Sequence, residues 1–498
     1  MKSKSILQRN IYSSILPQFV NILSNFILPT MIIVAYGSQV NGLVSTIRTI
    51  ISYVALVGAG IATATTQALY APVANSNTEE VKGMLKAADN MFNHWGYIYL
   101  LLVSFISLLY PFLIESDIDY LTMVSLLLVM SVSGASEFFI VGRCRSLLYA
   151  NQKVYVCSQI QALSLFISLL FAVVLLKLEV NIILVQLSIS FVYILRAILL
   201  RWYVNKEYPE FVNLKNVAPI KKATEKRKDA MLHQLTGLVV TSSQTVILSM
   251  MVGLEAASIF AVYNIIFSGI YSICSNINVA VTPFLGKVFA VGTLKQVYEK
   301  YQLCEISFYL ICSFVFGVTV FVILPFVALY TQHADINYIY HDFAILFVIV
   351  QFFSIYRLPS NALINVAGHY KETRLRAIIE ALICFVSSII FTYLYGMYGV
   401  LLGTGCAIGW RCLDIIFYSH HILLHVSVKK SLFRFLRCLI IIIISYFISN
   451  RIEITISSYL SWILYSICIS IFISVILFLD VSLFERQMLQ RIRLSSQK

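Results

Sequence analysis

Several arginines and carboxylates of this chain lie inside long apolar stretches. The clearest are Arg48, Arg357, Arg411, Glu137 and Glu380. A charged side chain within a bilayer is costly, so such residues usually face a protein-lined or water-filled path, and carboxylates there can relay protons. A guanidinium offers planar, paired donors that match anions such as a diphosphate. The pattern indicates a membrane protein that passes an anionic group or a proton.

Arg48 is the leading candidate for binding an anion. It lies about eight residues, or ~12 Å at 1.5 Å per residue, inside a predicted helix at 40–68, which is too deep for easy snorkelling. We expect this guanidinium to line a cavity. The alternative is a structural arginine whose donors bind helix carbonyls.

Two later helices carry further charges. Arg357 precedes Pro359 in IYRLPSNALIN, where the proline frees a backbone carbonyl, so we expect a kinked, polar helix and count Arg357 as a second cavity cation. Arg411 and Asp414 are spaced i, i+3 and can pair on one helical face. That spacing favours a structural pair. The alternatives to a structural pair are that Arg411 lines the cavity and that Asp414 takes part in coupling transport to an ion.

Two carboxylates are candidates for coupling transport to protons or sodium. Glu137 and Glu380 lie in the predicted cytoplasmic thirds of their helices. Arg143 or Arg376 could neutralise them, whereas a carboxylate facing the cavity could carry a proton. Arg196 is near enough to the inner surface to act as an anchor.

The first helix has a polar face without charge. Gln18, Asn21, Ser24 and Asn25 follow at i, i+3, i+6 and i+7, and the predicted seventh helix repeats the pattern faintly with Gln244. Amides and hydroxyls in this arrangement suit a hydrated lumen that accepts sugars, although small polar residues also mediate helix packing.

The composition defines the class of protein. Of the 498 residues, 59% are hydrophobic and only 12% are charged, about half the charged share of a soluble domain. The apolar runs are longer than the ~10-residue strands of an outer-membrane barrel. The sequence therefore predicts an all-α polytopic membrane protein.

We expect about fourteen transmembrane helices. Basic segments follow every even-numbered helix, so the positive-inside rule places both termini in the cytoplasm and accounts for the net charge of +13 without nucleic acid. The predicted spans are 10–36, 40–68, 91–114, 119–143, 155–176, 180–202, 230–252, 255–283, 304–330, 337–363, 375–395, 398–420, 431–449 and 458–480.

The two halves of the chain resemble each other weakly. An offset of 216 residues places Gly37 on Gly253 and Arg48 on Asn264, which we count as a cavity residue of the second half. Two copies with an even number of helices share one orientation, so we expect a 6+6+2 arrangement about an axis along the membrane normal. The predicted parts are a lobe at 1–205, a cytoplasmic linker at 206–229, a lobe at 230–425, and two further helices with a basic tail at 426–498.

With this layout the whole chain resembles the multidrug, oligosaccharidyl-lipid and polysaccharide exporter (MOP) superfamily, and within it the O-antigen or capsular polysaccharide flippases. The resemblance includes the turn RCRSLLYANQKVYV after the fourth helix and its counterpart NALINVAGHYKET after the tenth. It implies two six-helix lobes forming a V around a central cavity. The implied substrate is an undecaprenyl-pyrophosphate-linked oligosaccharide, flipped across the bacterial inner membrane.

The resemblance also implies possible partners, namely membrane lipids and the polysaccharide polymerase or chain-length machinery. Two other functions remain open. A cation-coupled MATE-type drug exporter should carry a deep carboxylate in its first or seventh helix, and none is present. A membrane-embedded polymerase or glycosyltransferase usually needs a larger extramembrane segment. We expect no catalytic site and no cofactor or metal, and the ten cysteines lack metal-type spacing.

Overall fold

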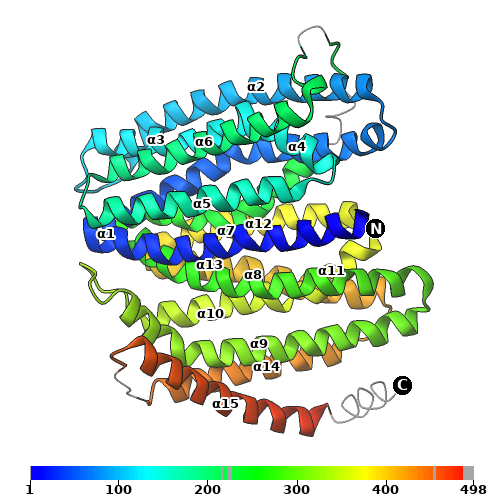
Figure 1. Ribbon diagram of the computed structural model, residues 1–498. Coiled ribbons are helices and arrows are strands. Elements are labelled where there is room, and N and C mark those ends of the chain that lie inside the picture. The colour runs from blue at the N-terminus through cyan, green and yellow to red at the C-terminus, as the bar shows by residue number, and fades with distance from the viewer. Residues whose placement is uncertain (1, 215–216, 221–226, 453–455, 486–498) are drawn as a thin grey trace. The chain divides into compact units, whose positions relative to one another are not determined.

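The computed structural model describes residues 2–214, 217–220, 227–452 and 456–485, and within these ranges it is helical with no strand (Figure 1). The first helices are α1 (Lys2–Ala74), α2 (Thr78–Leu109), η1 (Tyr110–Leu113), α3 (Tyr120–Ser136), η2 (Glu137–Val141), α4 (Gly142–Ala150), α5 (Val154–Lys177), α6 (Ile182–Glu207) and η3 (Pro209–Phe211). The others are α7 (Arg227–Met251), α8 (Leu254–Val291), α9 (Leu294–Tyr330), α10 (His341–Tyr356), α11 (Leu358–Ala367), α12 (Tyr370–Tyr395), α13 (Met397–Tyr418), η5 (Ser419–Leu423), α14 (Lys429–Ser449) and α15 (Tyr459–Phe484).

The fourteen predicted spans are found in order. Twelve stretches of the described residues are long and apolar enough to cross a membrane. That number counts the two arms of α1 once and leaves out the shorter apolar part of α7, Thr236–Met251. The predicted all-α fold class is therefore confirmed. The last part of the predicted basic tail, 486–498, lies outside the described residues.

Helix α1 contains two predicted spans joined at one residue. The short gap between the predicted spans 10–36 and 40–68 contains no loop, because residues 38 and 39 are helical and the break lies at Gly37, with φ 84° and ψ 170°. This backbone conformation is essentially restricted to glycine. Gly253, its equivalent at the offset of 216 residues, also has a positive φ of 123°. The two repeat copies thus change direction at matching glycines.

An acidic side chain stabilises the start of the second arm of α1. Asp335, between α9 and α10, accepts hydrogen bonds from the Ser38 N–H at 3.0 Å and the Ser38 hydroxyl at 2.5 Å. The first N–H groups of a helix have no intrahelical acceptor, so a carboxylate there acts as a cap. Beside it, the Gln39 side chain donates a hydrogen bond at 3.3 Å to Glu255, the residue with which the offset of 216 pairs it.

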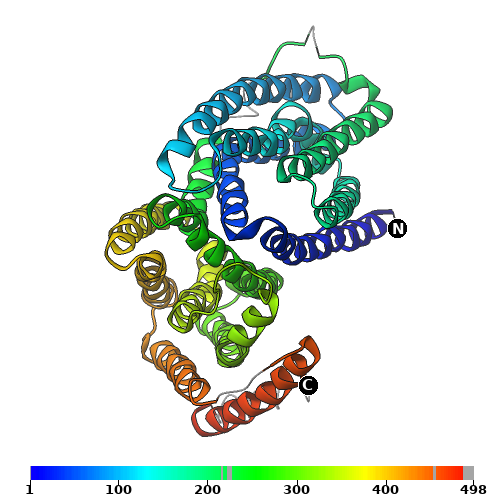
Figure 2. The ribbon, with the colours of Figure 1, turned by 90° about the vertical axis from the view of Figure 1, so that its left-hand side faces the viewer.

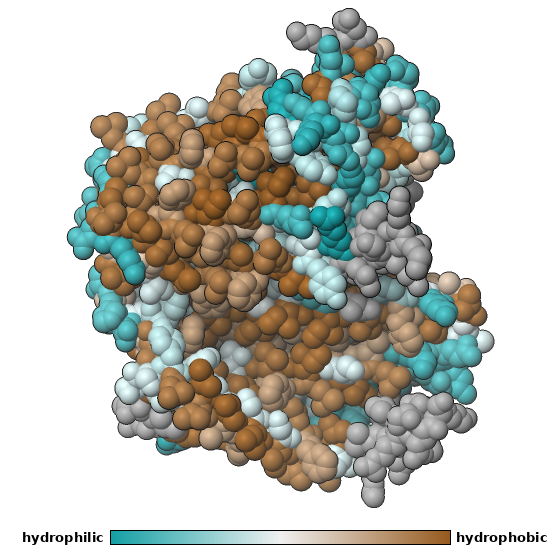
Figure 3. All heavy atoms as spheres, in the orientation of Figure 1, coloured by the Kyte–Doolittle hydropathy of each residue, from teal (hydrophilic) through white to brown (hydrophobic). Residues whose placement is uncertain are grey.

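The contacts of the chain divide it into two compact units. The first comprises the described residues up to Ala261 together with Ala334–Ile336, and the second comprises the remainder. The predicted lobe boundaries and the V-shaped arrangement stay predictions. In the upper part of Figure 3, which holds α2–α6, hydrophobic surface covers the middle of the helices and hydrophilic surface gathers at their ends. This is the pattern of helices that cross a bilayer.

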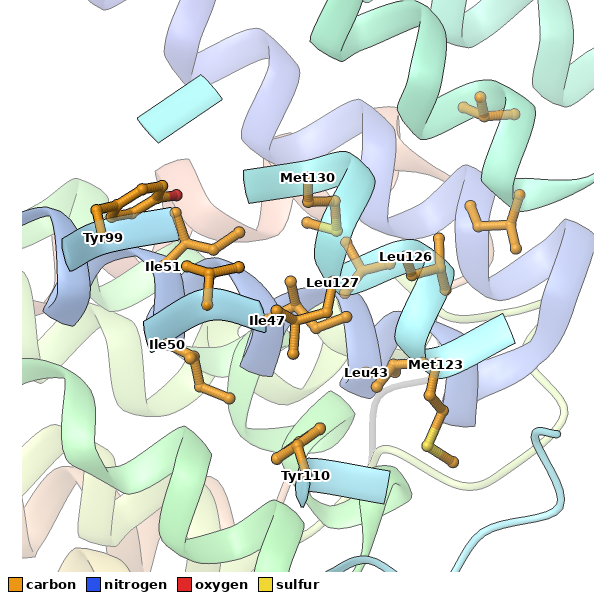
Figure 4. Packing of buried hydrophobic residues seen from close by; sticks show 14 of the residues in the cluster. Leu43, Ile47, Ile50, Ile51, Tyr99, Tyr110, Met123, Leu126, Leu127 and Met130 are labelled. Atoms are coloured by element: carbon orange, nitrogen blue, oxygen red, sulfur yellow. The ribbon is translucent and has the colours of Figure 1, made fainter. Parts of the chain in front are cut away.

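The core of the first unit lies between the second arm of α1 and α3. Leu43 and Ile47 of α1 lie against Leu126 and Leu127 of α3, and Tyr99 of α2 lies at one edge of the same cluster (Figure 4). Lipid tails are as apolar as these side chains, so close van der Waals packing rather than water exclusion holds such helices together. Figure 2 shows the helices of this unit along their axes.

Buried ion pairs connect α9, α14 and the end of α15 within the second unit. Arg434 of α14 pairs with Glu305 of α9 at 2.8 Å and with Glu485, just after α15, at 2.9 Å. Arg437 pairs with Glu485 at 3.0 Å and with Asp480 at 3.7 Å. These charges are therefore matched inside the protein, and we assign them a structural role.

We expect Gly37→Ala to destabilise the protein. The new Cβ would meet Asp335 Oδ2 at 2.9 Å, and the backbone conformation itself costs about 1–3 kcal/mol for a residue other than glycine. The measurement is the melting temperature in detergent. Gly269→Ala is the control, because a Cβ at this helical position meets nothing within 4 Å. Equal melting temperatures for the two variants would contradict the argument.

The Asp335 contact should depend on pH. Burial alone would raise the pKa of Asp335, but hydrogen bonds from Ser38 outweigh it and hold that pKa below its ordinary value. A depressed folded-state pKa gives stabilisation that is present above the unfolded pKa of about 3.9 and is lost as the pH falls through the folded value. We therefore expect the difference in melting temperature between wild type and Asp335→Ala to shrink between pH ~7 and pH ~3.

The control for this pH series is Gln332→Ala, which changes an exposed, uncharged residue of the same connection. Its melting temperature should follow that of the wild type at every pH. A difference between wild type and Asp335→Ala that stays constant across the series would show that the carboxylate charge does not act at Ser38.

Candidate functional site

A polar cavity of about 300 Å³ lies inside the first unit. Both arms of α1, together with α3, α5 and α6, form its wall. It is lined by Asn21, Ser24, Asn25, Leu28, Arg48, Ile51, Ser52, Met130, Ser133, Leu165, Ser168, Gln186, Ile189, Ser190 and Tyr193. No Asp or Glu is among these residues.

The break at Gly37 lets one helix supply two walls. In the first arm, Asn21, Ser24 and Asn25 fall at i, i+3 and i+4, so they share the face that lines the cavity. The Ser24 hydroxyl donates to the Val20 carbonyl oxygen at 2.9 Å, whereas Asn21 and Asn25 are exposed. Both amides are therefore available to a ligand.

The second arm separates a core face from a cavity face. Leu43 and Ile47 pack against α3, as described above, and Ile50 belongs to the same buried cluster (Figure 4). Arg48 and Ser52, at i and i+4, line the cavity instead. Burial of the apolar neighbours fixes the rotation of this arm and thereby directs the Arg48 side chain into the cavity.

Arg48 carries the only formal charge among the residues that line this cavity. Its side chain is exposed there and makes no hydrogen bond or ion pair with any residue that the structure describes. The guanidinium therefore keeps its paired donors free for an incoming anion.

Helix α6 contributes a wall that our sequence reasoning missed. Gln186, Ser190 and Tyr193 line the cavity at i, i+4 and i+7. Gln186 is only 3% exposed, and its Nε2 has no acceptor within the described part of the chain. The spacing of polar residues along IILVQLSISFVYILR could have indicated this wall. We did not predict it because our candidates in the later helices were charged residues, and Gln186, Ser190 and Tyr193 carry no charge.

Three other predicted cavity residues lie elsewhere. Gln18 is exposed on α1 but does not line this cavity. Gln244 is buried in α7 and donates its side-chain amide to the Val240 carbonyl oxygen at 2.7 Å. Asn264, the repeat equivalent of Arg48, is half-buried on α8 in the second unit. Their roles in substrate binding stay predictions.

Arg357, which we predicted to be a second cavity cation, is paired with a carboxylate. It lies at the break between α10 and α11, where a kink was predicted, and its Nη1 is 2.6 Å from Glu380 Oε1 of α12. Arg411 Nε lies 3.5 Å from Glu380 Oε2. Arg411 also forms the predicted ion pair with Asp414, which in turn pairs with Arg376. Two carboxylates thus hold three guanidinium groups inside the second unit.

Glu137 is likewise paired, although not with the residue we expected. It lies in the π-helical turn η2, where Arg145 Nη2 approaches to 2.6 Å and Arg196 Nη2 to 3.3 Å. Arg143 pairs with Asp89 instead. Arg196 therefore has a protein partner in addition to its predicted position near the surface. Ion coupling through Glu137, Glu380 or Asp414 stays a prediction.

No protein-family model matches the sequence, and no curated protein matches it. Solved structures share its fold. Lipid II flippase MurJ, in an inward closed conformation, has a TM-score of 0.70 at 17% identity over 95% of this chain and 99% of its own. An inward-facing multidrug resistance MATE family transporter of the MOP superfamily has a TM-score of 0.66 at 11% identity, and the match covers 84% of this chain and 99% of the transporter. A Vibrio cholerae MATE transporter has a TM-score of 0.56 at 12% identity, and the match covers 83% of this chain and 96% of the transporter.

We expect Glu380→Gln to destabilise the protein. The substitution keeps the shape of the side chain but leaves Arg357 and Arg411 without a shared charge, and breaking a buried ion pair costs about 3–5 kcal/mol. The effects of Glu380→Gln and Arg357→Gln on melting temperature should be non-additive, because the two residues contact each other. Glu372→Gln, which alters an exposed carboxylate of the same helix, is the control. Additive effects would show that Arg357 and Glu380 do not interact, and would contradict the ion pair between them.

Proposed function

We propose that this protein is a transporter that flips an anionic, lipid-linked oligosaccharide across the bacterial inner membrane by alternating access. Undecaprenyl-pyrophosphate-linked repeat units for O-antigen or capsule synthesis are the substrate class that we favour. The observation that carries the proposal is Arg48, a cation in a polar cavity whose described lining residues include no carboxylate to neutralise it.

The electrostatic argument starts from the cost of charge inside a membrane. Most intramembrane arginines described above are paired with carboxylates, which offsets that cost. Arg48 is not, so a diphosphate entering the cavity would supply the missing negative charge and bind through charge-assisted, bidentate hydrogen bonds. Such hydrogen bonds contribute about 1.5–3 kcal/mol each.

The remaining polar residues suit the sugar that follows the diphosphate. Asn21, Asn25 and Gln186 offer amide donors and acceptors, and serine hydroxyls lie between them. The volume of about 300 Å³ is at the lower end of the usual range for ligand pockets, about 300–1,000 Å³. We infer that the cavity holds the diphosphate and the nearest sugar rather than the whole oligosaccharide.

The fold neighbours support this class of substrate in part. One is named as a lipid II flippase and others as multidrug transporters, so a cation-coupled drug exporter is the main alternative. A cavity whose only charge is an arginine repels a cationic drug and attracts an anion. We therefore favour a flippase, and likewise a transporter over a membrane-embedded enzyme. Both termini would lie in the cytoplasm, and polymerase or chain-length proteins would be its partners.

Arg48 variants test the proposal by direct binding. Farnesyl diphosphate is the probe, and purified Arg48→Gln should bind it at least ~10-fold more weakly than wild type, because one charge-assisted contact is lost. Arg48→Lys should lie between the two, since it keeps the charge but not the paired donors. Lys295→Gln, which removes an exposed charge on α9, is the control.

The same variants should be compared in a flippase-null strain at matched expression. Loss of surface glycan with Arg48→Gln and its retention with Lys295→Gln would support the proposal. Unchanged binding of farnesyl diphosphate by Arg48→Gln would overturn it, as would efflux of cationic dyes that persists in that variant.

A further inference from the structure

A second polar cavity lies in the first unit, separate from the one around Arg48. It measures about 200 Å³ and lies among α2, η2, α4 and α6. Its polar lining consists of Asp89, Asn93, Arg143 and Arg201, and it has no lining residue in common with the first cavity. The function proposed above makes no use of it.

The charges of this cavity are not balanced. Asp89 pairs with Arg143 at 3.4 Å, the long end of the ion pairs in this unit. Arg201 has no ion pair and no hydrogen bond to any residue in the described ranges, and the Asn93 side chain likewise forms no hydrogen bond there. Two arginines against one aspartate leave the lining with a net charge of +1. One monovalent anion would complete it.

The position of the cavity along the helices indicates where that anion comes from. Arg201 lies six residues before the end of α6 at Glu207, or ~9 Å along the helix axis. The next residue, Trp202, is 59% exposed, and Lys206 Nζ lies 5.2 Å from the centre of its ring. Exposed tryptophan beside lysine is typical of the membrane–water interface. The cavity is therefore at the level of lipid headgroups.

A second exposed aromatic side chain packs against a residue that lines the cavity. Tyr97 of α2 is 67% exposed and packs edge-to-face against Phe139, which lines the cavity. Figure 1 shows α4, which contributes Arg143 to the lining, near the end of the unit where α6 ends. By the positive-inside rule, the basic connections of that end are cytoplasmic, so the headgroups concerned are those of the inner leaflet.

We propose that this cavity binds the phosphate of an anionic phospholipid of the cytoplasmic leaflet. Arg201 and Arg143 would donate to the phosphate oxygens, and Asn93 would donate to a neighbouring ester or hydroxyl oxygen. A zwitterionic lipid does not match the net charge of +1, whereas phosphatidylglycerol does. Basic pockets between helices near this surface are the setting in which proteins select anionic headgroups.

The experiment measures lipid binding by the full-length protein in detergent. Dioleoyl-phosphatidylglycerol should raise the melting temperature, because a ligand that binds only the folded state stabilises it. Dioleoyl-phosphatidylcholine and inorganic phosphate should not. Arg201→Gln should weaken phosphatidylglycerol binding at least ~10-fold, the loss of one charge-assisted contact. Because Arg201 has no acceptor among the described residues to lose, this variant should fold normally.

Two controls separate this site from other charges. Lys206→Gln removes a neighbouring cation outside the cavity and should leave the lipid effect unchanged. Arg48→Gln should also keep the full lipid effect, and Arg201→Gln should bind farnesyl diphosphate like the wild type. Equal stabilisation of wild type and Arg201→Gln by phosphatidylglycerol would overturn the proposal. So would equal stabilisation by phosphatidylcholine, or by inorganic phosphate, which would identify a soluble anion as the ligand.

Discussion

The candidate site depends on the break in α1 at Gly37. Because the backbone there has a positive φ that only glycine adopts readily, the helix changes direction without a loop. Its first arm then presents Asn21 and Asn25 to a cavity, and its second arm presents Arg48 to the same cavity. Asp335 caps the start of the second arm through Ser38. Gly253, which the predicted repeat pairs with Gly37, also has a positive φ.

Charge matching organises the rest of the described chain. A charge within lipid is tolerated when it is paired or lines a wet path, and the pairs Arg357 with Glu380, Arg196 with Glu137, and Arg434 with Glu305 satisfy the first condition. These ion pairs connect neighbouring helices in addition to van der Waals packing and interhelical hydrogen bonds. An arginine that has no carboxylate partner among the described residues therefore indicates the second condition, a wet path or a ligand. Arg48 and Arg201 are such residues, and each lines a polar cavity.

The two cavities suit different ligands because they lie at different depths along the helices. The Arg48 cavity is surrounded by amides and hydroxyls well inside the helices, as expected for a compartment that receives a phosphate with its sugar. The Arg201 cavity lies near a helix end beside an exposed tryptophan, where lipid headgroups are found. Under the two proposals above, the first unit would bind the transported anion and a lipid phosphate in separate cavities that share no lining residue.

The sequence by itself determined the membrane character, the order of the helices and part of the site. Lipid requires every backbone hydrogen bond to be satisfied internally, so long apolar runs become helices whatever their neighbours. The spacing of Asn21 and Asn25 and the depth of Arg48 are likewise local properties. Only the tertiary structure decided which charges are paired. Arg357 and Glu380 are 23 residues apart, and Arg196 and Glu137 are 59 apart. Such contacts depend on which helices pack together and on how each is rotated, and the packing of apolar faces, rather than any local pattern, sets that rotation.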